Sequence, residues 1–335
     1  MPIERSTGVC EMRAGFGQFS TASREYLRFA AQYGVKDVLL NTPQLPDAGG
    51  KWAVNDLVKL RLQVESEGLK LMALENVPTH FYVDIMLGGP NHDRQIENMI
   101  QTVRNIGAAG IPIFGYNWMP SHVWRTEPEL IRGGALATAF DYEEALKMPN
   151  THGREHTEEE MWERLEEWIR IITPVAEEAG VRCGIHPCDP PVEKLGGIPQ
   201  LFRSFESYKR LTQIVDSPCN AIEFCQGTFS EMEDAANGGI YDMIRYFGER
   251  KKILYVHFRN VSGPVPKFRE EFINTGHVDM YKAMQIYHEV GYDSFFIDDH
   301  VPQTFEDTPW GHRGRAFANG YIQAMIEAVT KQSVG

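Results

Sequence analysis

Four residues of metal-binding type recur along the second half of the chain, each at the end of a short apolar segment. They are His186, Cys225, His257 and Asp299. Neutral imidazole, thiolate and carboxylate groups together make a ligand set for a divalent transition metal. One buried cysteine more often packs as a small apolar side chain, but four ligand types at four equivalent places favour a metal site. Two imidazoles and a thiolate favour Zn²⁺ or Fe²⁺, and the carboxylate also allows Mn²⁺.

The segment Ile-Leu-Tyr-Val-His-Phe-Arg-Asn at residues 253–260 has the pattern of a strand that ends in polar residues. Side chains alternate between the two faces of a strand, so Tyr255, His257 and Arg259 share one face. An imidazole and a guanidinium are costly to bury without partners. Arg259 either holds a substrate carboxylate through two hydrogen bonds or belongs to a structural salt bridge, and the sequence leaves both interpretations open.

These segments belong to a regular alternation of strands and helices. Apolar runs predict strands at about residues 12–19, 35–40, 69–77, 111–116, 181–186, 221–225, 253–259 and 294–299. Helical spacing of apolar residues predicts helices at about residues 21–33, 55–68, 92–109, 158–179, 205–215, 240–247, 280–290 and 314–329. The alternation implies parallel strands joined by helical crossovers. We therefore predict an α/β fold, a (β/α)₈ TIM barrel, with a doubly wound open sheet as the alternative.

In such a barrel the catalytic residues lie at the carboxyl ends of the strands. Tyr116 and Asn117 end the fourth strand, where they either bind substrate hydroxyls or pack the loop. The connection that follows, about residues 117–157, is long for a compact domain. We expect it to form a lid over the active site, with Trp124 and Arg125 binding the substrate.

Length and composition limit the class of protein. The chain has 335 residues, a size that α/β barrels often reach as one domain, so we expect a single domain over residues 1–335. A net charge of −13 argues against nucleic acid or an anionic membrane surface as a partner. The sequence contains no apolar run of about 18 residues that would predict a membrane span, and its first residues lack the pattern of a signal peptide.

The cysteines have no regular spacing. They are Cys10, Cys183, Cys188, Cys219 and Cys225. An odd number of cysteines without an export signal predicts free thiols in a reducing compartment. We therefore expect a cytoplasmic protein without disulfides.

Motifs from about residue 87 to the C-terminal region occur in the order of a known enzyme family. They include L-G-G-P-N-H-D-R-Q-I-E-N from Leu87, Y-N-W-M-P from Tyr116, H-P-C-D-P-P from His186, V-H-F-R-N-V from Val256 and D-D-H from Asp298. In these motifs the chain resembles the D-mannonate dehydratases, a metal-dependent family on the xylose-isomerase-like barrel. The resemblance implies that His300 acts as an acid or base. It also implies a Mn²⁺ ion held by His186, Cys225, His257 and Asp299.

The resemblance further implies a hydro-lyase that converts D-mannonate to 2-keto-3-deoxy-D-gluconate in hexuronate catabolism. A base removes the proton α to the carboxylate, a hydroxyl leaves from the next carbon, and the metal stabilises the enediolate. The ordinary pKa of a histidine lies near neutrality, which suits His300 to such a transfer. The expected partner is a small-molecule sugar acid, and we expect a homo-oligomer.

The chain departs from the family pattern near the expected site. Cys188 stands where the family has an aspartate, and Glu223 adds an acidic residue on the strand face of Cys225. Trp310 and Arg313 stand where the family has two tyrosines, one of them proposed for proton transfer. These changes concern the substrate and the proton transfers rather than the metal ligands.

A second proton-transfer group is therefore needed. An indole only donates a hydrogen bond, so Trp310 cannot supply it. We predict His312, two positions further on, with Glu223, Tyr255 or a metal-bound water as alternatives. Two other functions stay open: a metal-dependent sugar isomerase or epimerase, and a non-catalytic protein that binds a metal or a sugar acid.

Overall fold

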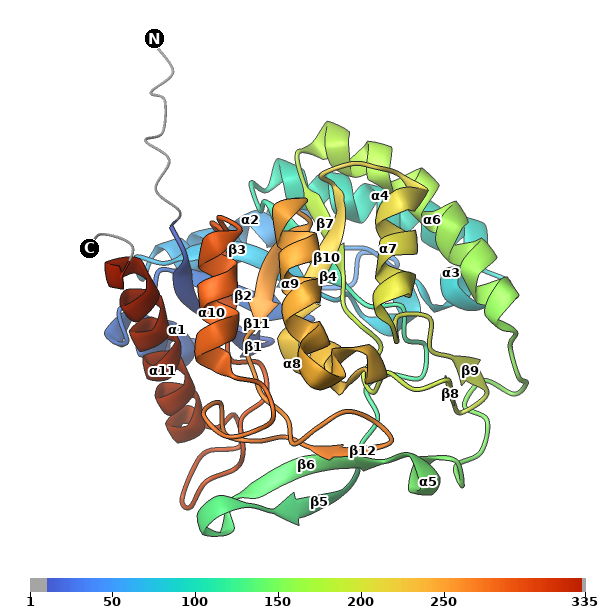
Figure 1. Ribbon diagram of the computed structural model, residues 1–335. Helices are drawn as coiled ribbons and strands as arrows, with labels where there is room; N and C mark the ends of the chain where they lie inside the picture. Colours follow the sequence, from blue (N-terminus) through green and yellow to red (C-terminus); the bar gives the residue numbers. More distant parts are fainter. Residues whose placement is uncertain (1–10, 333–335) are drawn as a thin grey trace.

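Eight parallel strands close into a barrel in the computed structural model, which describes residues 11–332 (Figure 1). In barrel order they are β1 Arg13–Phe19, β13 Phe295–Ile297, β11 Ile253–His257, β10 Asn220–Cys225, β7 Arg182–Ile185, β4 Ile113–Tyr116, β3 Lys70–Glu75 and β2 Asp37–Asn41. β1 pairs in parallel with both β13 and β2, which closes the ring. The predicted (β/α)₈ barrel is confirmed, and the open-sheet alternative is wrong.

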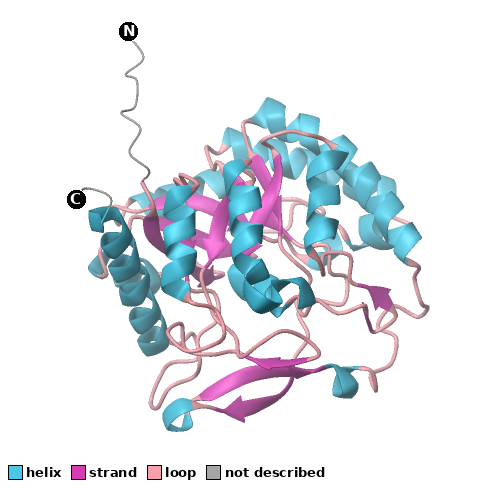
Figure 2. Ribbon diagram, in the orientation of Figure 1, coloured by secondary structure: helices cyan, strands magenta, loops and turns pink. Residues whose placement is uncertain are grey.

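Helices follow the strands and cover the outside of the barrel (Figure 2). The longer ones are α1 Arg24–Gln32, α2 Val54–Glu65, α4 His92–Ala108, α6 Glu158–Ala179, α7 Phe205–Ile214, α9 Gly239–Glu249, α10 Met280–Glu289 and α11 His312–Gln332. The short ones are α3 Val83–Leu87, α5 Tyr142–Ala145, α8 Gln226–Glu231 and the 3₁₀ turns Thr79–Phe81, Arg132–Gly134 and Glu233–Gly238. None of the described helices combines the length and the apolar character needed to cross a membrane.

The longest helix, α6, shows how local sequence sets these boundaries. The Thr157 side chain accepts from the Glu160 backbone N–H, and the Glu160 side chain accepts in turn from the Thr157 backbone. This reciprocal pair satisfies N–H groups that a helix start otherwise leaves without partners. Gly180, with a left-handed φ of 67°, ends the helix. Trp168 and Ile172 lie on its buried face.

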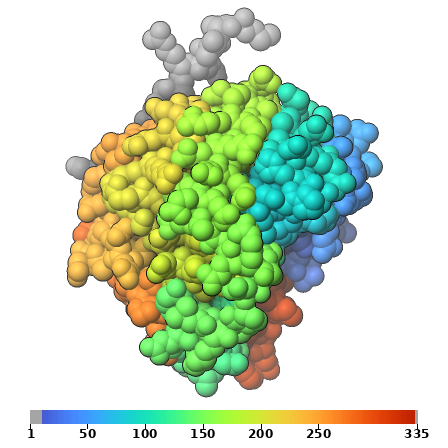
Figure 3. All heavy atoms as spheres, turned by 90° about the vertical axis from the view of Figure 1, so that its right-hand side faces the viewer, coloured from blue at the N-terminus to red at the C-terminus, as the bar shows by residue number. Residues whose placement is uncertain are grey.

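The connection between β4 and α6 carries strands of its own. β5 Thr126–Leu130 and β6 Leu136–Asp141 form an antiparallel hairpin, and β12 Lys267–Arg269 pairs with β6. We call these three strands the outer sheet; a second small hairpin joins β8 Lys194–Leu195 to β9 Ile198–Pro199. The outer sheet lies below the barrel in Figure 1, and Figure 3 shows the connection in green at that end, continuing into α6. The sequence predicted only a long loop here, because β5 and β6 are short and β12, which pairs with β6, lies much later in the chain, after β11.

Buried polar side chains fill part of the barrel interior. Glu223 and Tyr255 precede Cys225 and His257 by two positions on β10 and β11, so they lie one layer deeper on the same strand face. Both are completely buried. A Cβ atom at Gly115 would overlap the Tyr255 hydroxyl and lie 2.5 Å from Glu223 Oε2. The glycine on β4 therefore leaves the space that these two polar groups occupy.

All the cysteines in the described part of the chain are free thiols. They are Cys183, Cys188, Cys219 and Cys225; Cys10 lies outside the described residues. We expect mass spectrometry of freshly purified protein under non-reducing conditions to find no disulfide, with a reduced and alkylated sample as the control. A stoichiometric bridge in the unreduced sample would contradict the prediction of a reducing compartment.

Candidate active site

The ends of four neighbouring barrel strands bring the predicted metal ligands together. His186 follows β7, Cys225 and His257 end β10 and β11, and Asp299 follows β13. His186, Cys225 and His257 each offer a ligand atom, and these atoms lie within 4.8 Å of one another. The Oδ2 atom of Asp299 lies 3.8 Å from Cys225 Sγ and 3.4 Å from His257 Nδ1. Parallel strands open their carboxyl ends at one mouth of the barrel, which is why residues far apart in sequence meet here.

Hydrogen bonds orient both imidazole rings. His186 Nδ1 lies 2.7 Å from the carbonyl oxygen of Pro187, which only accepts, so Nδ1 donates to this oxygen and Nε2 is the nitrogen left for a metal. His257 Nε2 lies 3.0 Å from Glu75 Oε2 and donates to that carboxylate. Its Nδ1 is buried and has no hydrogen-bond partner among the described residues. A carboxylate or a backbone carbonyl behind a histidine is common at metal sites, and these contacts hold both rings with their other nitrogen free for a metal.

The charges around the cluster favour an ionised thiolate and carboxylate. Burial raises the pKa of the Cys225 thiol, but Arg259 and His186 outweigh that effect and lower the pKa to about 5. Burial also opposes ionisation of Asp299, whose pKa is nevertheless held well below its ordinary value by His300, His257 and Arg259. Thiolate and carboxylate are the forms that bind metals. The donor set therefore fits a divalent transition metal.

Arg259 lies next to the cluster and is fully occupied by protein partners. Its side chain is 1% exposed. Nε donates to Asp299 at 2.9 Å and Nη2 donates to Asp189 at 3.0 Å and to Thr228 at 2.8 Å. Nη1 donates to Glu231 at 3.0 Å and Glu270 at 2.8 Å. A guanidinium has five N–H donors, and none is left for a substrate carboxylate. Of the two interpretations that the sequence left open, the geometry favours the structural one.

Arg125 belongs to the same charge cluster. Its Nη1 and Nη2 atoms donate to the two oxygens of Asp189 at 2.6 and 2.9 Å, and Nη2 also donates to Glu270 at 3.2 Å. The neighbouring Trp124 packs against a small apolar cluster that contains Phe140. Neither residue lines the cavity at the barrel mouth. The geometry therefore does not support substrate binding by Trp124 and Arg125; these two residues anchor the start of the outer sheet to the barrel.

The cavity at the barrel mouth has a volume of about 80 Å³. His186, Asp299 and His300 line one side of it. His300 is half-buried, with Nδ1 3.1 Å from Glu270 Oε1 and Nε2 3.8 Å from Asp299 Oδ1. The imidazole of His300 therefore lies beside the predicted ligands, and Glu270 fixes the orientation of its ring.

Amide side chains form the opposite side of the cavity. Asn117 Nδ2 donates to Asn76 Oδ1 at 2.7 Å, Asn76 Nδ2 to Asn41 Oδ1 at 3.3 Å, and Asn41 Nδ2 to Gln18 Oε1 at 2.7 Å. We call these four residues the amide wall. Gln18, Asn76 and also Asp299 have left-handed φ angles of 61°, 59° and 56°, and such strained backbone concentrates at functional sites. Sequence reasoning found only Asn117, although the strand-end rule applied to the first three strands points to the others.

Tyr116 lies behind the cavity rather than in it. Its hydroxyl accepts from Trp168 Nε1 at 3.0 Å, and its ring stacks on Phe114 with 5.5 Å between ring centres. Burial raises the pKa of Tyr116 well above its ordinary value. Of the two interpretations of the fourth strand's end, packing fits Tyr116, whereas Asn117 lines the cavity.

Comparisons with known proteins identify the family. A family model described as D-mannonate dehydratase (UxuA) matches residues 12–153 and 144–334. The chain belongs to this family. A curated mannonate dehydratase from Streptococcus uberis is 31% identical and aligns with 94% of this chain and 97% of its own. The crystal structure of mannonate dehydratase from Streptococcus suis serotype 2 has a TM-score of 0.87 at 28% identity, covering 96% of this chain and 95% of that one.

More distant solved structures share the barrel alone. D-psicose 3-epimerase from Clostridium cellulolyticum H10 has a TM-score of 0.57 at 13% identity, with 96% of this chain and 97% of that one covered. At that identity the likeness concerns the fold and not the reaction. Membership of the D-mannonate dehydratases, a family of hydro-lyases, therefore rests on the family model and the close relatives.

The side chain of His312 does not line the cavity at the barrel mouth. His312 begins α11, with Nδ1 2.5 Å from Thr308 Oγ1 and its ring stacked on Tyr26 at 5.8 Å. Trp310 donates from Nε1 to the backbone carbonyl of Gln18 at 3.0 Å. The predicted role of His312 in proton transfer therefore has no support from the geometry.

Glu223, the acidic residue not expected in a D-mannonate dehydratase, lies inside the barrel below the ligands. Its Oε1 atom lies 3.3 Å from His257 Nε2. Burial, together with the charge of Glu75, raises the pKa of Glu223 well above its ordinary value. Glu223 does not line the cavity. It contacts a predicted ligand from behind, away from the space that a substrate would fill.

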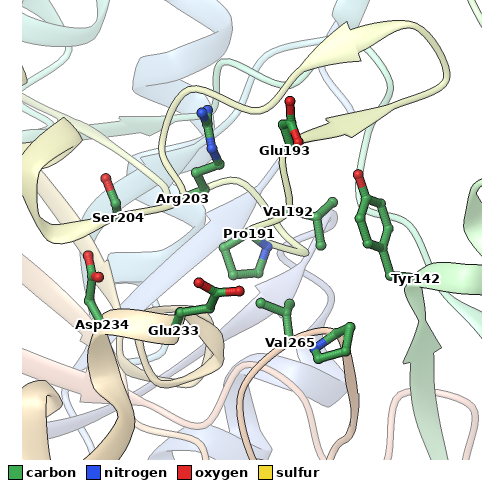
Figure 4. Close-up of a pocket in the computed structure, with 10 residues that line it drawn as sticks. Tyr142, Pro191, Val192, Glu193, Arg203, Ser204, Glu233, Asp234 and Val265 are labelled. Atoms are coloured by element: carbon green, nitrogen blue, oxygen red, sulfur yellow. The ribbon is translucent and has the colours of Figure 1, made fainter.

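A second pocket lies apart from the predicted metal ligands (Figure 4). Its lining includes Tyr142, Pro191, Val192, Arg203, Glu233 and Val265. It contains none of the four predicted ligands and not His300. The cavity at the barrel mouth is therefore the candidate active site.

Proposed function

We propose that the protein is a metal-dependent sugar-acid dehydratase that converts D-mannonate to 2-keto-3-deoxy-D-gluconate by β-elimination. The observation that carries this proposal is the convergence of metal-binding side chains beside His300 at one barrel mouth. The substrate and the reaction come from the close relatives, which are named mannonate dehydratases.

The proposed metal ligands are the two imidazoles, the thiolate and the carboxylate of the cluster. They are His186, Cys225, His257 and Asp299. Mn²⁺ is the metal we favour, with Fe²⁺ and Zn²⁺ as the alternatives that a mixed nitrogen, sulfur and oxygen set allows. When bound, such a cation supplies positive charge that stabilises the negative charge developing on the substrate oxygens.

His300 is proposed to move a proton at its Nε2 atom. Because Nδ1 is held by Glu270, Nε2 is the nitrogen that faces Asp299 at the cavity. In that orientation His300 either takes the proton from C2 or protonates the departing hydroxyl. The donors and acceptors of the amide wall suit the hydroxyls of an open-chain sugar acid.

The substrate carboxylate needs partners other than an arginine. Arg259 has no free donor, and Arg125 is bound to Asp189 and Glu270. Among the described residues that line the cavity, none is a lysine or an arginine. We therefore assign the carboxylate to the proposed metal site, where a bound cation would supply the positive charge.

Incubation of the purified protein with D-mannonate and Mn²⁺ tests the proposed function. We expect formation of a 2-keto-3-deoxy acid that has lost one water, and no product after treatment with a chelator. A product that keeps the mass of the substrate would instead indicate the isomerase or epimerase. Binding without turnover across a panel of aldonates and uronates would indicate the non-catalytic protein, and either result would overturn the dehydratase.

A further inference from the structure

The hydroxyl of Thr228 lies between Arg259 and Cys225. Arg259 Nη2 donates to Thr228 Oγ1 at 2.8 Å, and Thr228 Oγ1 lies 3.2 Å from Cys225 Sγ. A guanidinium only donates, so the hydroxyl accepts from Arg259 and its own proton is directed to the sulfur. Thr228 lies on the short helix α8, directly after β10, and is completely buried. The three groups therefore form a chain of hydrogen bonds that runs in one direction.

Arg259 also donates a hydrogen bond directly to a second predicted metal ligand. Its Nε atom donates to Asp299 Oδ2 at 2.9 Å. The remaining donors go to carboxylates on three other segments, which hold the guanidinium in place. These carboxylates belong to Asp189, Glu231 and Glu270. One fixed side chain thus contacts one predicted metal ligand directly and another through a hydroxyl.

We propose that Arg259 and Thr228 are positioning residues, which hold the Asp299 carboxylate and the Cys225 sulfur in the geometry that binds a divalent metal. A hydrogen bond donated to a thiolate also withdraws electron density from the sulfur. The Thr228 hydroxyl therefore sets the donor strength of Cys225 as well as its direction. This inference rests on the metal site of the proposed function and concerns residues outside the ligand set itself.

Thr228 is a better probe of this chain than Arg259. Removal of Arg259 would leave the buried Glu231 without its ion-pair partner and take one of the counter-charges from Asp189 and Glu270, and such changes are strongly destabilising. Thr228→Val keeps the shape of the side chain and removes only the hydroxyl. Thr228→Ser keeps the hydroxyl and serves as the conservative rescue. Ser230→Ala is the matched control, because Ser230 is buried on the same helix and bonds only the Gly227 carbonyl through its hydroxyl.

The test is metal binding measured without substrate. The dissociation constant for Mn²⁺ is obtained by competition with a chelator, and Co²⁺ serves as a spectroscopic probe of the metal–thiolate bond. We expect Thr228→Val to bind Mn²⁺ about 10- to 100-fold more weakly, the usual effect of losing a partner of a metal ligand. We also expect its thiolate-to-Co²⁺ charge-transfer band to move to lower energy. Thr228→Ser and Ser230→Ala should match the wild type in both measurements.

Two results would overturn the inference, and only the second would also overturn the proposed metal site. If the wild type shows the thiolate band and Thr228→Val leaves both the affinity and the band unchanged, the inference is wrong and the proposed metal site stands. If the wild type binds neither Mn²⁺ nor Co²⁺ through a thiolate, the metal site of the proposed function is wrong as well. A Thr228→Val protein that unfolds is replaced by the Thr228→Ala variant in the same measurements.

Discussion

Cys225→Ser and His257→Ala variants will each lose most of the metal that the purified wild-type protein contains, while the barrel stays folded. We propose that Cys225 and His257 contribute a thiolate and an imidazole nitrogen to the metal site, because with His186 they form a cluster whose potential ligand atoms lie within 4.8 Å of one another. Loss of one such donor removes a bond that the remaining side chains cannot replace. Elemental analysis measures the metal content, and circular dichroism reports whether the helices and strands persist.

Another buried cysteine supplies the control for this experiment. Cys183 lies on β7 and is 3% exposed, but it is not a member of the ligand cluster. Burial raises the pKa of the Cys183 thiol, so it stays protonated. Cys183→Ala should therefore keep the full metal content. Full occupancy in both ligand variants would remove Cys225 and His257 from the metal site.

His300→Asn should lower kcat by about 10²- to 10⁴-fold, the range typical of losing one general acid or base. The metal content should not change, because His300 lines the cavity beside Asp299 without belonging to the ligand cluster. Asparagine keeps a polar side chain of similar reach but cannot exchange a proton near neutral pH. Turnover of D-mannonate measures kcat, and elemental analysis of the same preparations measures the metal content.

His312→Asn is the matched variant for His300→Asn. Its ring packs on Tyr26 and bonds Thr308 outside the cavity, so we expect turnover close to that of the wild type. A loss equal to that of His300→Asn would restore the role that the sequence suggested for His312. Full turnover in His300→Asn on the true substrate would refute the elimination mechanism proposed for this site.

The barrel and the ligand cluster could be predicted because both follow from local pattern. Each strand is an apolar run, and each ligand stands at the end of its own run, so parallel pairing alone brings the ligands together. The positions of Asp299 and His257 could be predicted without knowing how the loops fold. The amide wall follows from the same rule, because Gln18, Asn41 and Asn76 lie at the carboxyl ends of β1, β2 and β3.

The surroundings of the ligands could not be predicted in the same way. The sequence left substrate binding by Arg259 open because its partners Asp189, Glu231 and Glu270 come from three separate segments, whose meeting no local pattern encodes. His312 was chosen for its proximity in sequence to Trp310. Because α11 begins at His312, the position of its ring is set by packing against Tyr26 and the ring does not reach the cavity.

The outer sheet has a consequence for how this barrel can be recombined with others. Loops on TIM barrels often change independently of the scaffold, but this segment shares ion pairs with the interior. Arg125 neutralises Asp189 from the start of the sheet, and Glu270, directly after β12, pairs with Arg259 and contacts His300. A chimaera that exchanges the outer sheet would leave buried charges without partners. The segment and the barrel interior therefore depend on each other for charge balance, and loop grafting here must transfer both sides of each ion pair.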